Sequence, residues 1–205
     1  MLLRFFIPSA YGCALSLAIL TVCAGTADAL SASLPDGSVV SPVGFTTPVE
    51  SFASAEALSP DRGLLAVLSS DAGALDILSL ANKGGLIERL RVPGATSLAW
   101  TSDGLYVARG YAGSIARFAY DPAKRSFASR GELRVDVSGL LNGISEDPKR
   151  HLIAVARSAR HEVVTIDDAS GGVVARHPTS GEPYATAFVG DALVASYFNA
   201  ERIAI

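Results

Sequence analysis

Polar loops that recur along the chain hold the residues best suited to chemistry. His161 and Glu201 occupy comparable positions in two of these loops, and either side chain could transfer a proton. Arg109 and Arg157 each open one of the loops, at equivalent positions. Because a guanidinium group binds an oxyanion through two parallel hydrogen bonds, the two arginines could hold one anionic ligand together. The sequence therefore predicts an acid–base site beside an anion-binding site, if the fold gathers these loops.

Asn142, Glu182 and Asn199 are three further candidates for ligand binding, because their amide or carboxylate groups can hydrogen-bond with a polar ligand. Asn142 and Glu182 lie in loops that enter predicted strands, and Asn199 shares a loop with Glu201. The alternative for all of these residues is a structural role. Arginines in loops often pair with a nearby acidic residue, and an exposed histidine such as His161 needs no partner.

Known metal, nucleotide and nucleophile motifs are missing from the sequence. It contains no HExxH, no EF-hand spacing, no P-loop and no Gly-x-Ser-x-Gly. The pair Asp167–Asp168 precedes Gly171 and Gly172, so a hairpin turn explains it better than a cation site does. We expect neither a metal ion nor another cofactor.

Four internal repeats must position the polar loops. An apolar anchor returns at steps of 40, 48 and 40 residues, and a second apolar run starts ten residues after each anchor. The anchors are Leu65, Leu105, Ile153 and Leu193, and the second runs begin at Leu75, Ile115, Val163 and Ile203. A constant inner spacing within a variable outer period indicates two paired strands in each repeat. The outer period is typical of a four-stranded blade of a β-propeller.

Two more strands complete the predicted blades. Outer strands are predicted at 86–92, 133–138 and 172–177, and short inner strands rich in small residues at 54–58, 97–100 and 184–188. Turn residues follow two of the inner strands, at 59–63 and 101–104. A β-sandwich with similar hairpins would also show a strand every 8–12 residues, but four repeats with one inner spacing favour an all-β propeller. The polar loops then meet at one mouth of its central channel.

The repeats resemble those of the YVTN and lactonase-like β-propellers of exported bacterial proteins. The resemblance rests on Leu58–Gly63, Thr101–Ala108, Phe118–Phe127 and Val164–Val174, and it extends over residues 53–205. It implies the fold more than the activity, because the family includes sugar-lactone hydrolases and many exported proteins with no established reaction. No catalytic signature of the lactonases matches this sequence.

Propellers of this family usually have six or seven blades, whereas this chain has room for about four. The fourth repeat stops at Ile205, inside its third strand. Residues 39–49 could supply the missing strand and close a small ring, although Pro42 and Pro48 suit only an edge strand. Otherwise the repeats form part of an incomplete larger propeller, or half of a homodimer that joins through the open blade edge.

The first 29 residues are interpreted as a secretory signal peptide that is cleaved after Ala29. Arg4 precedes an apolar stretch, and small residues at 27 and 29 match a cleavage site. An uncleaved membrane anchor is disfavoured because a proline and a glycine interrupt the stretch, and lipoprotein processing at Cys23 is a second alternative. We therefore expect a periplasmic or secreted protein with no membrane span after cleavage. Its N-terminal segment covers 30–52, and its repeats cover 53–205.

The charge balance argues against a nucleic-acid partner. The chain has 17 Lys and Arg against 20 Asp and Glu, so no basic surplus exists to bind phosphates. Two functions remain. We predict an exported binding or scaffold protein that recognises a protein or a small anionic ligand at the channel mouth. The alternative is a hydrolase of small sugar lactones or related esters, in which His161 or Glu201 activates water.

Overall fold

The computed structural model describes residues 32–33, 35, 39–40, 46–101, 103–135, 140–198 and 203–205. The chain divides into two units, residues 1–46 and 47–205. In the first unit, the described strands β1 (Ala32–Ser33) and β2 (Val39–Val40) pair antiparallel. The predicted signal peptide lies outside the described residues, so its cleavage stays a prediction.

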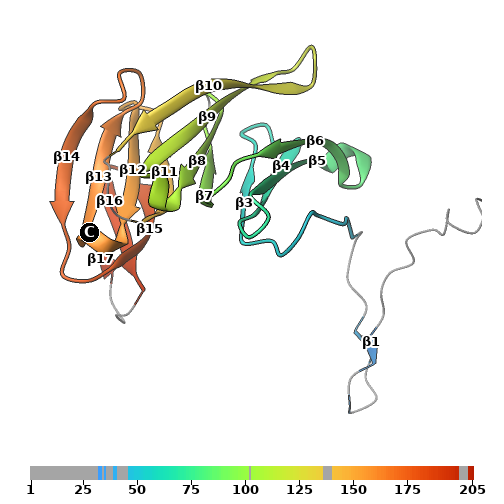
Figure 1. Ribbon diagram of the computed structural model, residues 1–205, viewed down its shortest axis with the longest axis horizontal. Coiled ribbons are helices and arrows are strands. Elements are labelled where there is room, and N and C mark those ends of the chain that lie inside the picture. Colours follow the sequence, from blue (N-terminus) through green and yellow to red (C-terminus); the bar gives the residue numbers. More distant parts are fainter. Residues whose placement is uncertain are drawn as a thin grey trace, which may run out of the picture. The chain divides into compact units, whose positions relative to one another are not determined.

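Four antiparallel sheets follow one another along the second unit (Figure 1). The first contains β3 (Ala55–Leu58), β4 (Leu64–Ser69), β5 (Ala74–Ser79) and β6 (Gly85–Arg91). The second contains β7 (Ala95–Trp100), β8 (Leu105–Arg109), β9 (Ser114–Asp121) and β10 (Ser126–Arg134). The third contains β11 (Leu141–Asp147), β12 (Leu152–Arg157), β13 (Glu162–Asp167) and β14 (Val173–Pro178). The fourth contains β15 (Pro183–Val189), β16 (Ala192–Tyr197) and β17 (Ile203–Ala204).

Three short 3-10 helices lie in the connections of these sheets: η1 (Leu80–Asn82), η2 (Gly110–Ala112) and η3 (Ser158–Arg160). None of the described helices has the length and apolar character that crossing a membrane would require.

The register of the sheets repeats as the sequence predicted. Each anchor residue lies in a second strand, and the second apolar run falls at the start of the third strand. The same pairing offset recurs in all four sheets: Leu68 with Leu75, Ala108 with Ile115, Ala156 with Val163, and Ser196 with Ile203. A constant offset requires connecting loops of one length, which explains the constant inner spacing.

Apolar side chains fill the spaces between successive sheets. The inner strands β3, β7, β11 and β15 pack on one another in that order. Large aliphatic residues dominate the first two spaces, including Leu68, Ile77 and Leu105 in one and Ile115, Ile153 and Ile166 in the other. The space between the third and fourth sheets holds a smaller buried cluster of Ala154, Val163 and Ala195, with Phe188 and Leu193 partly buried against it. The core therefore thins towards the fourth sheet.

The outer strand of the second sheet is β10, and not residues 133–138 as predicted. Its pairing with β9 shifts between Ser129 and Glu132, where Gly131 has a φ of 81°. A bulge of this kind adds a residue to one strand and breaks its period-two alternation. The alternation that the sequence offered for this strand was therefore misleading.

The fourth sheet has three strands among the described residues. Val39 and Val40, in the segment expected to close the ring, pair with β1. Glu50 and Ser51 bond to residues of the first sheet. Closure of a ring by residues 39–49 thus stays a prediction.

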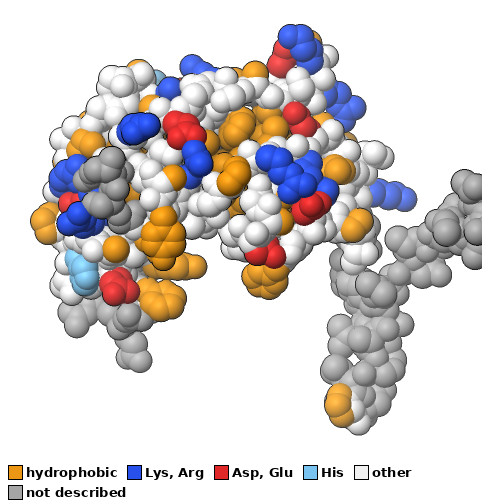
Figure 2. Space-filling view, in the orientation of Figure 1, with side chains coloured by type: hydrophobic (Ala, Val, Ile, Leu, Met, Phe, Trp, Pro, Cys, Tyr) orange, Lys and Arg blue, Asp and Glu red, His pale blue; other side chains and the backbone are white. Residues whose placement is uncertain are grey.

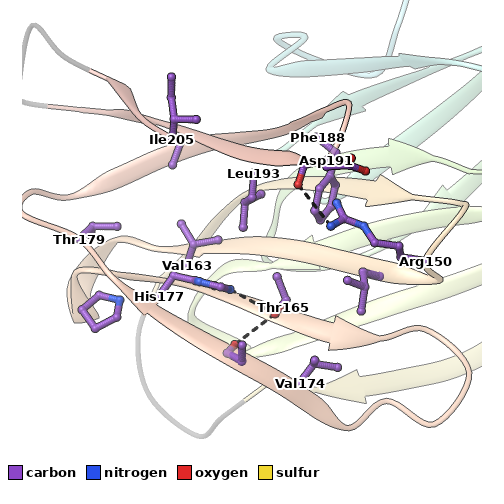
Figure 3. A pocket seen from close by; sticks show the side chains of 14 residues that line it. Arg150, Val163, Thr165, Val174, His177, Thr179, Phe188, Asp191, Leu193 and Ile205 are labelled. Carbon is purple, nitrogen blue, oxygen red and sulfur yellow. Dashed lines mark hydrogen bonds between the residues drawn. The ribbon is translucent and has the colours of Figure 1, made fainter.

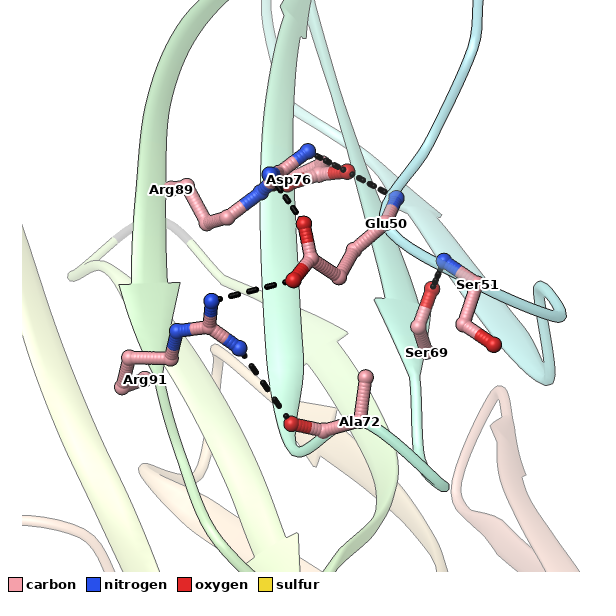
Figure 4. Close-up of polar contacts among 7 residues, drawn as sticks. All are labelled: Glu50, Ser51, Ser69, Ala72, Asp76, Arg89 and Arg91. Atoms are coloured by element: carbon pink, nitrogen blue, oxygen red, sulfur yellow. Dashed lines mark hydrogen bonds and ion pairs between the residues drawn. The ribbon is translucent and has the colours of Figure 1, made fainter.

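An ion-pair network around Glu50 covers one face of the first sheet (Figure 4). The backbone N–H of Glu50 donates to the carboxylate of Asp76 at 2.9 Å, and Asp76 is only 1% exposed. Arg89 bonds to both carboxylates, and Arg91 bonds to Glu50 at 3.0 Å. The residues on either side of Asp76 in β5 face the second sheet. The side chain of Asp76, and the network around it, therefore lie on the opposite face of the first sheet. Polar and charged groups therefore occupy the face of the first sheet that is turned away from the second sheet.

Aspartates at the strand turns accept hydrogen bonds from backbone N–H groups two or three residues further along. They are Asp61, Asp121, Asp147 and Asp167. Each carboxyl has a pKa below its ordinary value of 3.8 because these bonds are made to the charged form. The largest causes are, in the same order, hydrogen bonds from the Ser59 hydroxyl, the Lys124 N–H, the Arg150 side chain and the Ser170 hydroxyl.

Acid is expected to destabilise the folded protein through these turns. Because the folded pKa values lie below the unfolded ones, the stabilisation is complete above the unfolded pKa and is lost as pH falls through the folded values. The urea midpoint should therefore stay level near neutral pH and drop below about pH 4. Urea unfolding followed by circular dichroism at several pH values measures this dependence of the midpoint on pH. In the Asp147→Asn variant the midpoint should fall less with acid, because one of the turn carboxyls is missing. A midpoint that does not change down to about pH 2.5 would contradict the assignment.

Candidate functional site

The loops between the second and third strands of the first three sheets share one backbone turn. Gly73, Gly113 and His161 have φ angles of 57°, 63° and 53°, and each N–H donates to the carbonyl three residues earlier. His161 therefore stands where two other loops have glycine, in a left-handed conformation that favours glycine. Its side chain is exposed at the tip of this turn.

Arg157 lies inside the protein rather than at a ligand-facing surface. It is 1% exposed and pairs with Glu162, which is directly opposite it across β12 and β13. Glu162 also bonds to Arg176 of β14 at 2.8 Å. Two cations thus share the carboxylate of Glu162, and the charge of Arg157 is compensated within its own sheet.

Arg109 holds the equivalent position in the second sheet but has different surroundings. Ser114 lies opposite it, and its ion-pair partner is Glu132 of β10. Its side chain remains 25% exposed. The structure thus pairs each arginine with a carboxylate of its own sheet. The convergence of Arg109 and Arg157 on one anion stays a prediction, and the structure adds only that each arginine has a carboxylate partner.

A hollow of about 200 Å³ brings two of the predicted residues, Asn142 and Glu182, to one place. It is lined by Leu140, Asn142, Ser158, Glu182, Tyr184 and Phe198, from the third and fourth sheets and their loops. The Asn142 amide donates to the Ser158 hydroxyl, and that hydroxyl donates to the carbonyl of Pro183. These bonds fix the polar wall of the hollow.

Bulges at the start of the inner strands position the residues of this hollow. The pairing of β11 with β12 shifts between Leu141 and Ile144, and that of β15 with β16 shifts between Pro183 and Ala185. One extra residue thus lies in each strand, within Asn142–Gly143 of β11 and at Tyr184 of β15. Bulges redirect side chains in this way and are common next to binding sites.

Tyr184 and Phe198 form an aromatic pair on the rim of the hollow. Their ring centroids are 5.6 Å apart with the planes at 43°, and the residues are 51% and 68% exposed. Contiguous exposed apolar surface can mark a ligand-binding groove. Neither residue is among the site residues predicted from the sequence. Tyr184 falls within the predicted inner strand at 184–188, where an aromatic side chain is ordinarily assigned to the core.

Among the described residues, Arg109, Arg157 and His161 do not line this hollow. His161 lies on its exposed turn, and Arg109 belongs to the second sheet. Asn199 and Glu201 lie outside the described residues, so their roles stay predictions.

Three carboxylates gather at the other ends of the strands, where the second and third sheets meet. Oxygens of Asp103, Glu146 and Asp168 lie within 4.8 Å of one another, and this is the group of described residues that could hold a metal ion. The buried Tyr106 donates a hydrogen bond to Asp168, and Arg117 donates to the Asp168 carbonyl at 3.3 Å. Burial and the bond to Asp168 raise the pKa of Tyr106 well above its ordinary value of 10.0.

Charged side chains of both signs mix on the surface. On the face drawn in Figure 2, basic and acidic groups of the second unit lie close to one another in small clusters, with hydrophobic side chains between them. Ion pairs such as those of Arg89 and Arg91 with Glu50 explain part of this mixing.

Solved structures match the arrangement of the sheets. A protein from Lactobacillus plantarum aligns with 84% of this chain at a TM-score of 0.64 and 17% identity, over 58% of its own length. A functionally unknown protein from Desulfotomaculum acetoxidans aligns with 74% of this chain at a TM-score of 0.63 and 15% identity, over 50% of its length. The β-propeller domain of Cps50 (Swd1) from Myceliophteria thermophila aligns with 74% at a TM-score of 0.61 and 16% identity, over 52% of that chain.

The fold is that of a β-propeller. The four sheets are its blades, and the chain spans about half the length of the structures it matches. Identities this low show the fold alone. No protein-family model matches the sequence, and no similar sequence was found among curated proteins. The resemblance to YVTN and lactonase-like proteins therefore stays a prediction.

Proposed function

We propose that this protein is an exported β-propeller that binds a small polar ligand with one apolar face. Simple sugars are ligands of this kind. The observation that carries the proposal is the meeting of Asn142 and Glu182 with the exposed rings of Tyr184 and Phe198 around one hollow. The export part of the proposal rests on the pattern of the first 29 residues.

The chemistry of the hollow suits a sugar ring. Such a ring has C–H groups on its faces and hydroxyl groups around its edge. Aromatic rings make dispersion contacts with the C–H groups, and the amide of Asn142 and the carboxylate of Glu182 can hydrogen-bond with hydroxyls. A small anion has less support, because Arg109 and Arg157 are bound to carboxylates of the protein.

Binding can be tested by titrating the protein with glucose, galactose and δ-gluconolactone while recording amide NMR spectra. We expect saturable shifts centred on the hollow. Tyr184→Ala should weaken binding about tenfold, because an aromatic contact contributes on the order of 1 kcal/mol beyond its buried area. Tyr111→Ala is the matched control, because Tyr111 is 83% exposed and lies outside the hollow.

Two results would contradict the proposal. One is a folded protein that shows no saturable shift with any of the three compounds, and the other is an equal loss of binding in the Tyr111 control. Hydrolysis of δ-gluconolactone that depends on His161 would instead favour the alternative of a lactone hydrolase.

A further inference from the structure

A second cavity lies between the first and second sheets, at the turns that join their first and second strands. Its volume is about 360 Å³, which is within the range of sites that hold a small molecule. The aromatic residues Trp100 and Tyr120 line it, together with the acidic residues Asp61 and Asp103. Both rings pack on Phe127, with centroid distances of 5.6 and 4.9 Å, so the aromatic wall is held in place from behind.

Trp100 has an equivalent in the fourth sheet, Phe188. Each of these two residues ends an inner strand and is paired with the anchor residue of its sheet, Leu105 or Leu193. Both therefore lie at the same place in a junction between neighbouring sheets. The junction of the third and fourth sheets thus shows which chemical group packs on this aromatic position elsewhere in the same protein.

A guanidinium group of the protein packs on the ring at that junction. The guanidinium carbon of Arg150 lies 5.4 Å from the centroid of the Phe188 ring. Figure 3 shows Arg150 beside Phe188, with a hydrogen bond of 3.3 Å to the carbonyl of Asp191. The same guanidinium bonds to the carboxylate of Asp147. A cation–π contact, an ion pair and a hydrogen bond therefore hold it together.

The first sheet does not place its own arginine in the second cavity. Arg62 is the residue equivalent to Arg150, because each lies three positions before the anchor of its sheet. Arg62 has a φ of 58°, whereas in the third sheet the left-handed residue is the next one, His151. Arg62 is exposed, and no basic residue is among the described residues that line the cavity. The place that Arg150 fills in one junction is therefore not filled by an arginine in the other.

The turn carboxylates of the two junctions also differ in what they bind. Asp147 accepts backbone N–H groups with Oδ1 and the Arg150 guanidinium with Oδ2. Asp61 accepts the Ser59 hydroxyl and the Gly63 N–H with Oδ1, and its Oδ2 accepts no hydrogen bond from the described part of the chain. One oxygen of a turn carboxylate is therefore available to a cation in the second cavity.

We propose that this cavity binds the guanidinium group of a small organic cation. The plane of the guanidinium stacks on Trp100, and its N–H groups donate to Asp61, as those of Arg150 donate to Asp147 within the protein. Asp103 adds a second negative charge, because Arg130 bonds to its carbonyl and not to its carboxylate.

Trp100 is the only tryptophan of the chain, so its fluorescence reports directly on this cavity. We expect butylguanidinium to change the emission of the full-length protein saturably. Butylurea has nearly the same shape without the charge and should leave the emission unchanged.

Asp61→Asn should weaken the binding of butylguanidinium about fivefold, because it removes the charge but keeps an oxygen for the bonds of the turn. Asp167→Asn is the matched control. Asp167 accepts a hydroxyl and an N–H group of Ser170 in a turn of the third sheet, and it does not line the cavity. Its replacement should leave the binding unchanged.

The proposal would be overturned by an unchanged emission with butylguanidinium, by an equal response to butylurea, or by equal weakening in the two variants. Tighter binding of butylammonium would assign the cavity to an ammonium ion instead. Tighter binding of a blocked tripeptide with a central arginine would assign it to a protein side chain, and either result would also overturn the proposal.

The inference is independent of the proposed sugar site, because Asp61 does not line the hollow around Tyr184. Sugar binding should therefore be the same in Asp61→Asn and in the unmodified protein, whichever of the two proposals holds.

Discussion

Arg157→Ala is expected to lower the free energy of unfolding by about 3–5 kcal/mol, because removing one partner of a buried ion pair leaves the other charge uncompensated. Arg157 is 1% exposed, and the side chain of its partner Glu162 is 16% exposed. The loss should appear as a large decrease in the urea midpoint, measured by circular dichroism at neutral pH.

Arg109→Ala is the matched control for this experiment. Both arginines end the second strand of their sheets, and both pair with a glutamate. The side chains of Arg109 and its partner Glu132 are 25% and 42% exposed, and partly exposed pairs of this kind contribute about 0–1 kcal/mol. We therefore expect a small change in the midpoint for Arg109→Ala.

A double variant separates the ion pair from the rest of the packing. Arg157→Leu combined with Glu162→Leu removes both buried charges, so it should be more stable than Arg157→Leu alone. Recovery will be partial, because Glu162 also binds Arg176. If Arg157→Ala unfolds at the same urea concentration as the unmodified protein, the buried pair does not stabilise the fold, and the predicted ligand-binding role of Arg157 is favoured.

The sequence correctly predicted the strands whose spacing is set by the length of the connecting turn. Leu75, Ile115 and Val163 recur at one distance from their anchors because each connecting loop closes with the same turn. The prediction failed at β10, because the bulge at Gly131 changes which residues face the core. Periodicity alone cannot locate a bulge.

The candidate site was predicted only in part, for a similar reason. Equivalent repeat positions suggested equal roles for Arg109 and Arg157, but the residue across the strand differs, being Ser114 in one sheet and Glu162 in the other. That difference was present in the sequence and could have indicated a structural ion pair. The exposure of Tyr184 follows from a bulge in β15, which the sequence did not reveal.

The junction between the third and fourth sheets links the candidate ligand site to the stability of the fold. The buried cluster there is small, and the backbones of β11 and β15 approach closely beside it. A Cβ atom added at Gly143 of β11 would lie 2.4 Å from the Cα atom of Ala185 and 2.8 Å from the carbonyl oxygen of Tyr184. Beside this contact, the hydroxyl of Ser145 donates to that of Thr186 at 3.0 Å. The absence of a side chain at 143 is therefore what lets β11 and β15 approach.

Gly143→Ala is accordingly expected to destabilise the protein by about 2–3 kcal/mol, because backbone atoms must move apart to admit the methyl group. Gly63→Ala is the control, since its added Cβ would meet the Asp61 carboxylate no closer than 3.4 Å, and its effect should stay within about 0.5 kcal/mol. Hydrogen exchange should show where the damage falls. Amides of β15 and β16 should lose protection before those of β4 and β5, because the first sheet does not depend on this contact. Equal loss of protection in all four sheets would mean that the fourth sheet is not a separate cooperative unit, and the ligand site would then be as stable as the core.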